Sequence, residues 1–266
     1  MSPSLSREGT LYELGRALLR WLAGWWRIVH LGAVTLVLAL SPSTYHRANR
    51  QALARNVYLD AAPNLLWFTV LSALISLVLI RIVVVTAVSY GLTQYALEMV
   101  VRVLVLELIP LTAAVFAAVR VTLPNGAEIA ELRSRGEFET LRQRGLDPLQ
   151  HEVLPRIISG VFCVLFLASV ASVLTLVLAY LHVYGFTLEG LSRYMRDVGR
   201  VFSPPLALIF ALKTFFLALA VALIPVASVL YDLPRRARTS AELQGLVRMF
   251  VAILLIEAVS LAGNYY

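Results

Sequence analysis

The feature that most constrains this chain is a series of long apolar runs separated by short charged links. A helix needs about 20 residues to cross the roughly 30 Å hydrocarbon core of a bilayer, and six runs are candidates by length. Lipid offers the backbone no hydrogen-bond partners, so unbroken runs favour helices, whereas barrel strands would alternate apolar and polar residues. The sequence therefore predicts an all-α integral membrane protein.

Composition and charge support the same class. Of the 266 residues, 59% are hydrophobic and 15% are charged, whereas about a quarter of the residues in a soluble domain are charged. The 23 basic residues outnumber the 16 acidic ones, a bias that also occurs in nucleic-acid-binding proteins. Here they lie mostly in short links between apolar runs, as the positive-inside rule predicts. We therefore expect no nucleic-acid partner.

The first apolar run, residues 11–40, differs from the others. Three arginines and His30 interrupt it, and Trp21, Trp25 and Trp26 cluster where an interfacial anchor would lie. We expect an N-terminal elbow helix that lies at the membrane interface. The alternative is a sixth crossing, which would move the N-terminal arginines to the opposite side.

Five further runs are expected to span the membrane, the second with a kink at Pro110. These spans are predicted at 63–90, 95–119, 157–184, 204–230 and 246–261. With five crossings, the polar region 120–155 and the Arg235–Arg238 cluster fall on one face, which the arginine bias makes cytoplasmic. The arginines of the 185–203 loop lie on the other face and are the exception.

The polar region 120–155 is long for a chain otherwise so apolar, and such loops commonly carry function. Glu131 and Arg135 are four residues apart, as are Arg133 and Glu137 in the reverse order, which favours short charged helices. Their apolar positions form no continuous stripe, so two helices broken at Gly136 fit better than one. The region is either a coupling element that docks into a partner or a solvated connector.

Ionisable residues within the predicted spans form a second set of candidates, because charges in a membrane usually face a cavity or a partner. Glu98 and Arg102 are spaced to form an ion pair along one helix, and Glu107 is a candidate for a cavity. Arg81 and Lys213 either extend toward the interface or pair with a carboxylate.

Direct catalysis is not expected of this chain. The four histidines are scattered without metal-ligand spacing, and Cys163 lies inside an apolar run, where it suits packing. No nucleophile, base and acid occur together in a catalytic pattern. A Gly-rich phosphate-binding loop is also missing from the sequence, so any nucleotide must bind to another chain.

The stretch from Glu107 to Gly160 resembles the signature of MlaE-type permeases, the membrane subunits of ABC transporters that move phospholipid or related lipids. The positions that match are Glu107, Leu108, Pro110, Arg120, Glu128, Asp147, Pro148, Pro155 and Arg156. The resemblance extends more loosely from about Leu53 to Gly263. The sequence departs from the family pattern at Leu106, Ile109, Val119 and Gly136–Glu137.

This resemblance implies a homodimer with a lipid cavity between its subunits, in a bacterial inner membrane. It further implies a cytoplasmic ABC ATPase that binds ATP and Mg²⁺, a periplasmic MCE-domain protein and a STAS-domain protein. The cavity candidates are Glu107, Glu98 and Tyr90. The coupling candidates are Glu128, Glu131, Arg133, Arg135, Glu137 and Asp147. No catalytic or metal-binding residues are assigned.

Two other functions remain possible readings of the sequence. The departures at Ile109 and Gly136 suggest a membrane scaffold that has lost transport but still binds the ATPase. An intramembrane enzyme is a third hypothesis. A scaffold would bind the partner without holding lipid, whereas an enzyme would be active as this chain alone.

Overall fold

The computed structural model describes residues 4–41, 47–92, 95–187, 189–231 and 238–265, and these form helices joined by short turns. The Arg235–Arg236 part of the predicted cytoplasmic arginine cluster lies outside them. The elements are α1 (Ser4–Leu40), α2 (Arg47–Ser89), α3 (Ala96–Val100), η3 (Val101–Leu108), α4 (Ile109–Ala117), η4 (Ala118–Thr122), α5 (Leu123–Ser134), α6 (Glu137–Gln143), η5 (Leu149–Val153), α7 (Leu154–Tyr184), α8 (Leu191–Val201), α9 (Pro204–Tyr231) and α10 (Arg238–Tyr265).

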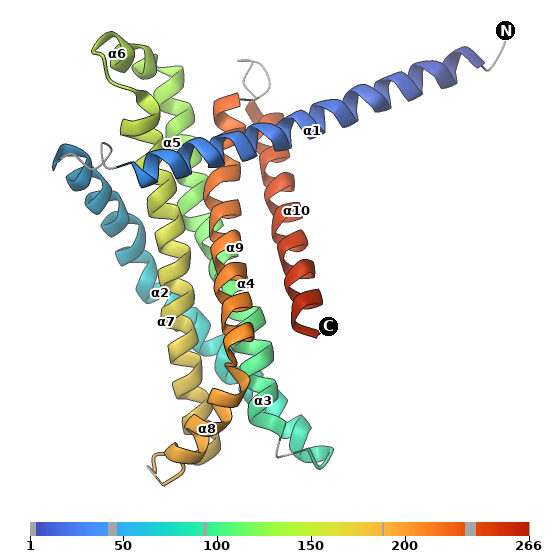
Figure 1. The fold of residues 1–266 in the computed structure, drawn as a ribbon, viewed down its shortest axis with the longest axis vertical. Helices are drawn as coiled ribbons and strands as arrows, with labels where there is room; N and C mark the ends of the chain where they lie inside the picture. The colour runs from blue at the N-terminus through green and yellow to red at the C-terminus, as the bar shows by residue number, and fades with distance from the viewer. Residues whose placement is uncertain (1–3, 42–46, 93–94, 188, 232–237, 266) are drawn as a thin grey trace.

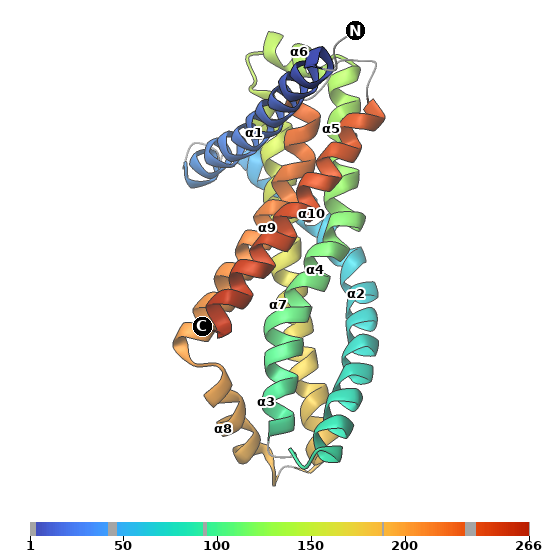
Figure 2. The same ribbon diagram turned by 90° about the vertical axis from the view of Figure 1, so that its right-hand side faces the viewer.

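The long helices form a bundle in which α9 is central (Figure 1). It packs against α7, α4, α5, α10 and the end of α1, while α2 pairs along its length with α7. The α5–α6 hairpin lies at one end of the bundle, and α8 lies at the other (Figures 1 and 2). A helix with so many neighbours can transmit a movement from one end of the bundle to the other.

The helical stretch Ala96–Ser134 continues without a break through the boundary expected at residue 119. Two segments within it, η3 and η4, are π-helical. The first of them ends just before Pro110, whose ring lacks an N–H and disturbs regular α-helical bonding. Short π-helical segments are often found at functional sites. Helix α5 is thus a direct extension of a membrane helix.

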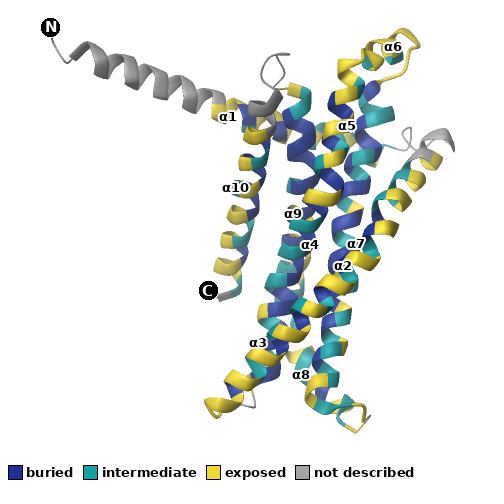
Figure 3. Cartoon of the chain, turned by 180° about the vertical axis from the view of Figure 1, so that it is seen from behind, coloured by how far each residue is buried: buried dark blue, intermediate teal, exposed yellow. Residues whose placement is uncertain are grey.

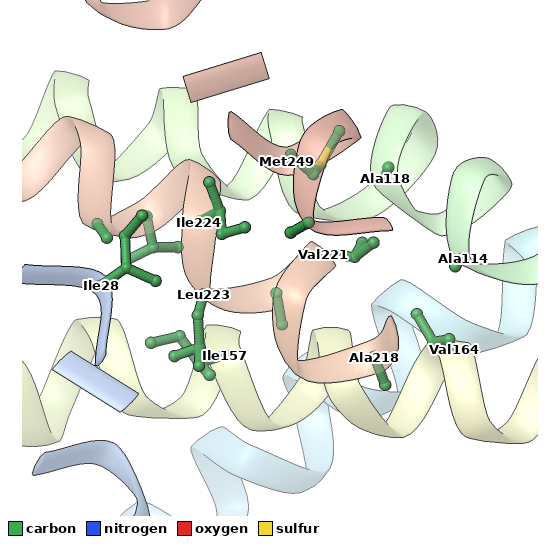
Figure 4. Packing of buried hydrophobic residues seen from close by; sticks show 14 of the residues in the cluster. Ile28, Ala114, Ala118, Ile157, Val164, Ala218, Val221, Leu223, Ile224 and Met249 are labelled. Carbon is green, nitrogen blue, oxygen red and sulfur yellow. The ribbon is translucent and has the colours of Figure 1, made fainter. Parts of the chain in front are cut away.

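Small residues allow the central helices to approach closely. The core contains Ala114 of α4, Ala118 of η4 and Ala218 of α9 (Figure 4). A Cβ atom added at Gly160 of α7 would lie 3.0 Å from Thr122 Cγ2 and 3.3 Å from Ala222 Cβ. Such small-residue contacts are the usual basis of helix association in membranes.

The outer faces of the bundle are apolar rather than charged. Large hydrophobic side chains are exposed along α2, such as Leu66 and Trp67, and along α10, such as Leu254 and Val259 (Figure 3). Within the residues that the structure describes, six helical stretches are apolar and long enough to cross a membrane, including one near the N-terminus. The chain is an all-α integral membrane protein, as predicted.

Helix α1 lies across one end of the bundle at a steep angle to the other helices (Figure 1). Ile28 and Leu31 are buried against α9, whereas Trp26 is 73% exposed. The Arg27 guanidinium donates a hydrogen bond to the Tyr231 carbonyl oxygen at the end of α9 (3.4 Å). This orientation fits the predicted elbow, although the apolar segment Trp21–Leu40 is also long enough to cross.

At the opposite end, α8 packs its Tyr194 side chain into the bundle. The ring is buried against those of Tyr180 and Tyr184, and its hydroxyl donates a hydrogen bond to the Leu176 carbonyl oxygen (2.6 Å). Burial raises the pKa of Tyr194 to about 12. The arginines of this helix, Arg193, Arg196 and Arg200, are exposed.

Candidate functional site

A buried charge cluster joins three elements of the bundle. Lys213 of α9 is 3% exposed. Its ammonium donates hydrogen bonds to the carboxylate of Glu107 in η3, to Glu257 Oε1 in α10 (2.8 Å) and to the Leu106 carbonyl oxygen (3.4 Å). The sequence left two possibilities open for Lys213, and the structure shows that it pairs with carboxylates.

The second carboxylate oxygen of Glu107 is also bonded. Asn264, near the end of α10, donates a hydrogen bond from Nδ2 to Glu107 Oε1 (2.6 Å). Charged and polar groups thus tie η3, α9 and α10 together at one level. Charges at membrane depth are stable only when they are paired or face a cavity, and this cluster does both.

A cavity of about 430 Å³ lies beside the cluster, between α9 and α10. Its size falls in the range of small-molecule sites, which are mostly apolar with a few polar groups. Lys213 and Ser260 are the polar side chains in its wall. The full lining is Ile209, Leu212, Lys213, Phe216, Leu255, Ile256, Val259, Ser260 and Gly263. An apolar chain of a lipid suits such a lining.

The three predicted cavity residues do not come together. Glu107 adjoins the cavity through its ion pair with Lys213. Glu98 of α3 instead pairs with Arg102 (Nε–Oε1 3.0 Å), and both side chains are about one third or more exposed. Tyr90 follows α2 and is 77% exposed. Neither Glu98 nor Tyr90 lines the α9–α10 cavity.

The polar region 120–155, for which a coupling role was predicted, contains two helices, α5 and α6, separated at Gly136, and this break agrees with the prediction. Gly136 has a φ of 77°, which favours glycine, and α6 begins directly after it. The predicted pair of Glu131 and Arg135 forms (2.5 Å), and both side chains are exposed. Glu137 is exposed in the first turn of α6. These charged groups are accessible to a partner.

The spacing of Arg133 and Glu137 suggested an ion pair between them, but the Arg133 side chain points toward α9 instead. Its Nη1 donates hydrogen bonds to the backbone carbonyl oxygens of Val229 (2.9 Å) and Leu230 (2.6 Å) in the last turn of α9. Nearer the start of α5, a Cβ added at Gly126 would lie 3.5 Å from Pro225 Cβ. Helix α5 therefore lies directly on α9, the helix that carries Lys213.

Other residues of the sequence motif shape the base of this region. Arg156 of α7 binds Glu152 (Nη1–Oε2 2.5 Å) and lies 3.6 Å from Glu128 of α5. Asp147 Oδ1 accepts a hydrogen bond from the backbone N–H of Leu149 (3.0 Å) as η5 begins. Motif positions Pro110 and Pro148 are buried, whereas Arg120 is exposed.

Two important carboxylates were not singled out from the sequence. One is Glu257 of α10, although a lone acid inside the run 246–261 is itself a signal. The other is Asp60 of α2, whose Oδ2 accepts hydrogen bonds from Asn125 Nδ2 of α5 (3.1 Å) and Ser159 Oγ of α7 (2.5 Å). Its signal was weaker because Asp60 precedes the predicted start of the span at residue 63.

In the part of the chain that the structure describes, no three His, Cys, Asp or Glu side chains come close enough to bind one metal ion. The chemistry that the arrangement offers is binding and movement: an apolar cavity, a buried ionic cluster beside it, and a charged helix pair at the far end of α9.

Comparison with known protein families identifies the family of this chain. A search of curated proteins finds no significant match. The family model described as Permease MlaE matches residues 53–262, which is most of the chain and includes α5, α6 and all of the cavity lining except Gly263. The matched range agrees with the extent of the resemblance inferred from the motif. The chain therefore belongs to the MlaE permease family, and it is a multi-pass membrane transport subunit of the lipid-transporting ABC class.

Proposed function

We propose that this chain is the permease of an ABC transporter that moves phospholipid between the bacterial inner membrane and the outer envelope. A separate cytoplasmic ATPase would bind ATP and Mg²⁺ and drive the cycle. The observation that carries the proposal is the cavity between α9 and α10, which has an apolar wall and a buried ionic cluster at its side.

Helix α9 offers a direct mechanical route from the ATPase to the cavity. Its last turn accepts hydrogen bonds from Arg133 of α5, and its earlier part contributes Lys213 and Phe216 to the cavity wall. When the partner ATPase closes around ATP, it would shift the α5–α6 pair, and α9 would move with α5. The cavity would then change shape and expose its lipid.

The outer face of α10 supports a homodimer. Val247, Leu254 and Val259 are each more than half exposed, and α10 makes its main contacts with α9 alone. A second copy packed on this face would enclose the cavity between two subunits. A periplasmic MCE-domain protein at the α8 end and a STAS-domain protein bound to the ATPase would complete the assembly.

The test is to co-purify the chain with its ATPase in detergent and to measure bound phospholipid by mass spectrometry. Gly263→Leu would fill part of the cavity, because Gly263 lies in the cavity wall and an added Cβ makes only an ordinary contact with Ile209 Cδ1, at 3.8 Å. We expect it to lose most bound lipid and the lipid stimulation of ATP hydrolysis. Gly199→Leu, on the exposed face of α8 with open space around it, is the matched control.

The same experiment separates the alternatives. A scaffold that no longer transports would co-purify with the ATPase and hold no phospholipid. Its ATP hydrolysis would then be affected equally by Gly263→Leu and Gly199→Leu. This hypothesis rests on the departures from the family pattern, of which Ile109 is buried in the core. Chemical turnover of lipid by the chain without its ATPase would instead indicate an intramembrane enzyme.

A further inference from the structure

Asp60 of α2 lies where three helices meet. Its Oδ2 accepts a hydrogen bond from Ser159 Oγ of α7 (2.5 Å) and another from Asn125 Nδ2 of α5 (3.1 Å). Ser159 is fully buried, whereas Asp60 and Asn125 are half-buried. Hydrogen bonds to a carboxylate are about twice as strong as those between neutral groups. One side chain of α2 therefore holds both α7 and the start of α5.

A second hydrogen bond between α2 and α7 shows what is particular to Asp60. Ser76 of α2 bonds to Thr175 of α7 through their hydroxyl groups (2.7 Å). This bond and the one between Asp60 and Ser159 both join residues 99 apart in sequence. The two helices therefore run parallel and keep one register over about 24 Å. The Ser76 contact also fixes this register, so what distinguishes Asp60 is its bond to Asn125 of α5.

Helix α5 is held by two neighbours near its start. Asn125 bonds to Asp60 of α2. A Cβ added at the next residue, Gly126, would lie 3.5 Å from Pro225 Cβ, so α5 and α9 are in close contact there. Arg133 follows about 12 Å farther along the helix, and it bonds to the last turn of α9. Helix α5 is therefore attached to α2 at its start and to α9 at both ends.

We propose that Asp60 is a positioning residue that couples ATP hydrolysis to the movement of α9. The inference rests on the proposed function, in which the partner ATPase shifts the α5–α6 pair. With Asn125 held by Asp60, a force at the α6 end tilts α5 about its start, and Arg133 passes the tilt to α9. Without that hold, α5 would slide or turn in place and move α9 less. Asp60 is not among the residues that line the α9–α10 cavity, so it acts through α5.

The experiment uses the full chain in complex with its ATPase in detergent. ATP hydrolysis is measured with and without an added mixture of ethanolamine and glycerol phospholipids, and the unfolding temperature is recorded. Asp60→Ala removes both hydrogen bonds and should reduce the stimulation by lipid about tenfold, the factor that corresponds to one hydrogen bond to a charged group. Basal hydrolysis and the KM for ATP should not change, because the proposed nucleotide site lies in the ATPase chain.

Three further variants separate positioning from stability. Asp60→Asn keeps an oxygen that can accept both bonds, so it should retain most of the stimulation. Asn125→Ala removes only the bond to α5 and leaves Asp60 bonded to Ser159, so it should uncouple as Asp60→Ala does. Ser76→Ala is the matched control: it removes the other bond between α2 and α7 and should lower the unfolding temperature without changing the stimulation.

The outcomes are distinguishable. Wild-type stimulation in Asn125→Ala, or an equal loss in Ser76→Ala, would overturn the positioning role of Asp60 while lipid transport still stood. A defect in Asp60→Asn as large as that in Asp60→Ala would also contradict it, because the two bonds would then not be what matters. If Asp60→Ala does not fold, Asn125→Ala decides. A wild-type complex that holds no lipid and shows no stimulation by it would overturn the proposed function itself.

Discussion

Arg133 of α5 donates a 2.6 Å hydrogen bond to the backbone carbonyl oxygen of Leu230 in the last turn of α9. The final carbonyls of a helix have no partners within it, and a cation there also interacts favourably with the helix dipole. The same α9 contributes Lys213 to the buried cluster. One guanidinium therefore links the α5–α6 helix pair to a helix that forms part of the cavity wall.

The first prediction concerns this link. Arg133→Ala should reduce lipid-stimulated ATP hydrolysis by about fivefold, as expected from the loss of an interaction of about 1 kcal/mol. Binding of the ATPase should be unchanged, because Arg133 points toward α9. ATPase assays on the co-purified complex measure both properties.

The matched control is Arg135→Ala. Arg135 lies on the same element and pairs with Glu131 at the exposed surface. Its loss should weaken binding of the ATPase if that surface is the docking face, and should not uncouple an ATPase that remains bound. Equal uncoupling by the two variants would contradict a specific role for the contact between Arg133 and α9.

The second prediction tests the charge cluster. Lys213→Met leaves the buried carboxylates of Glu107 and Glu257 without their cation and should destabilise the protein by about 3 to 5 kcal/mol. Adding Glu257→Gln should restore part of the loss, because one uncompensated charge is removed. Thermal unfolding in detergent measures both effects.

Arg102→Met is the comparison for that experiment. It breaks the ion pair with Glu98, which is partly exposed and spaced four residues along one helix. Pairs of this kind contribute only about 0.3 to 0.5 kcal/mol. A Lys213→Met variant no less stable than Arg102→Met would show that the buried cluster is not a structural element.

The membrane helices were predictable because the length and hydropathy of a run decide whether it can span lipid. The helices extend beyond the predicted spans: α2 begins at Arg47, ahead of the span predicted from residue 63, and the helical stretch that contains the span 95–119 continues through α5. Polar residues do not end a helix unless the backbone itself is interrupted. Gly136, with its positive φ, does interrupt it, and the break there was correctly predicted.

The site was predictable only in part. Glu107 and Lys213 stood out as charges in apolar runs, but the contact between them spans 106 residues of sequence. Hydrophobic periodicity shows that a helix has an inner face, and it does not show which faces of different helices meet. The same limit explains why Glu98, equally visible as a membrane acid, forms only a local pair with Arg102.

The third prediction concerns helix packing at Gly160. Gly160→Ala places a Cβ 3.0 Å from Thr122 Cγ2 and 3.3 Å from Ala222 Cβ, so these two neighbours must shift by a few tenths of an ångström. We expect a loss of about 1 to 3 kcal/mol, measured as a lower unfolding temperature in detergent. Gly199→Ala in α8 meets no atom within 4 Å and should be neutral or stabilise by up to about 1 kcal/mol. Equal effects of the two substitutions would argue against close packing at Gly160.

The fourth prediction is a pH dependence at the α8 end. Burial raises the pKa of Tyr194 to about 12, compared with about 10 for an exposed tyrosine. Between these pH values the folded protein keeps the phenolic proton while the unfolded chain loses it, so stability falls as pH rises. The contribution is complete below about pH 10 and is lost as the pH passes 12.

Tyr194→Phe isolates this effect. At pH 8 the variant should be less stable than wild type by about 1 kcal/mol, because the hydrogen bond to the Leu176 carbonyl oxygen is lost. Above pH 10 the difference should shrink and then reverse, since phenylalanine has no proton to lose and is indifferent to alkali. Unfolding temperatures of both proteins from pH 8 to 11.5 provide the measurement. Parallel curves over that range would mean that Tyr194 ionises alike in the folded and unfolded chain, and that α8 does not shield it from water.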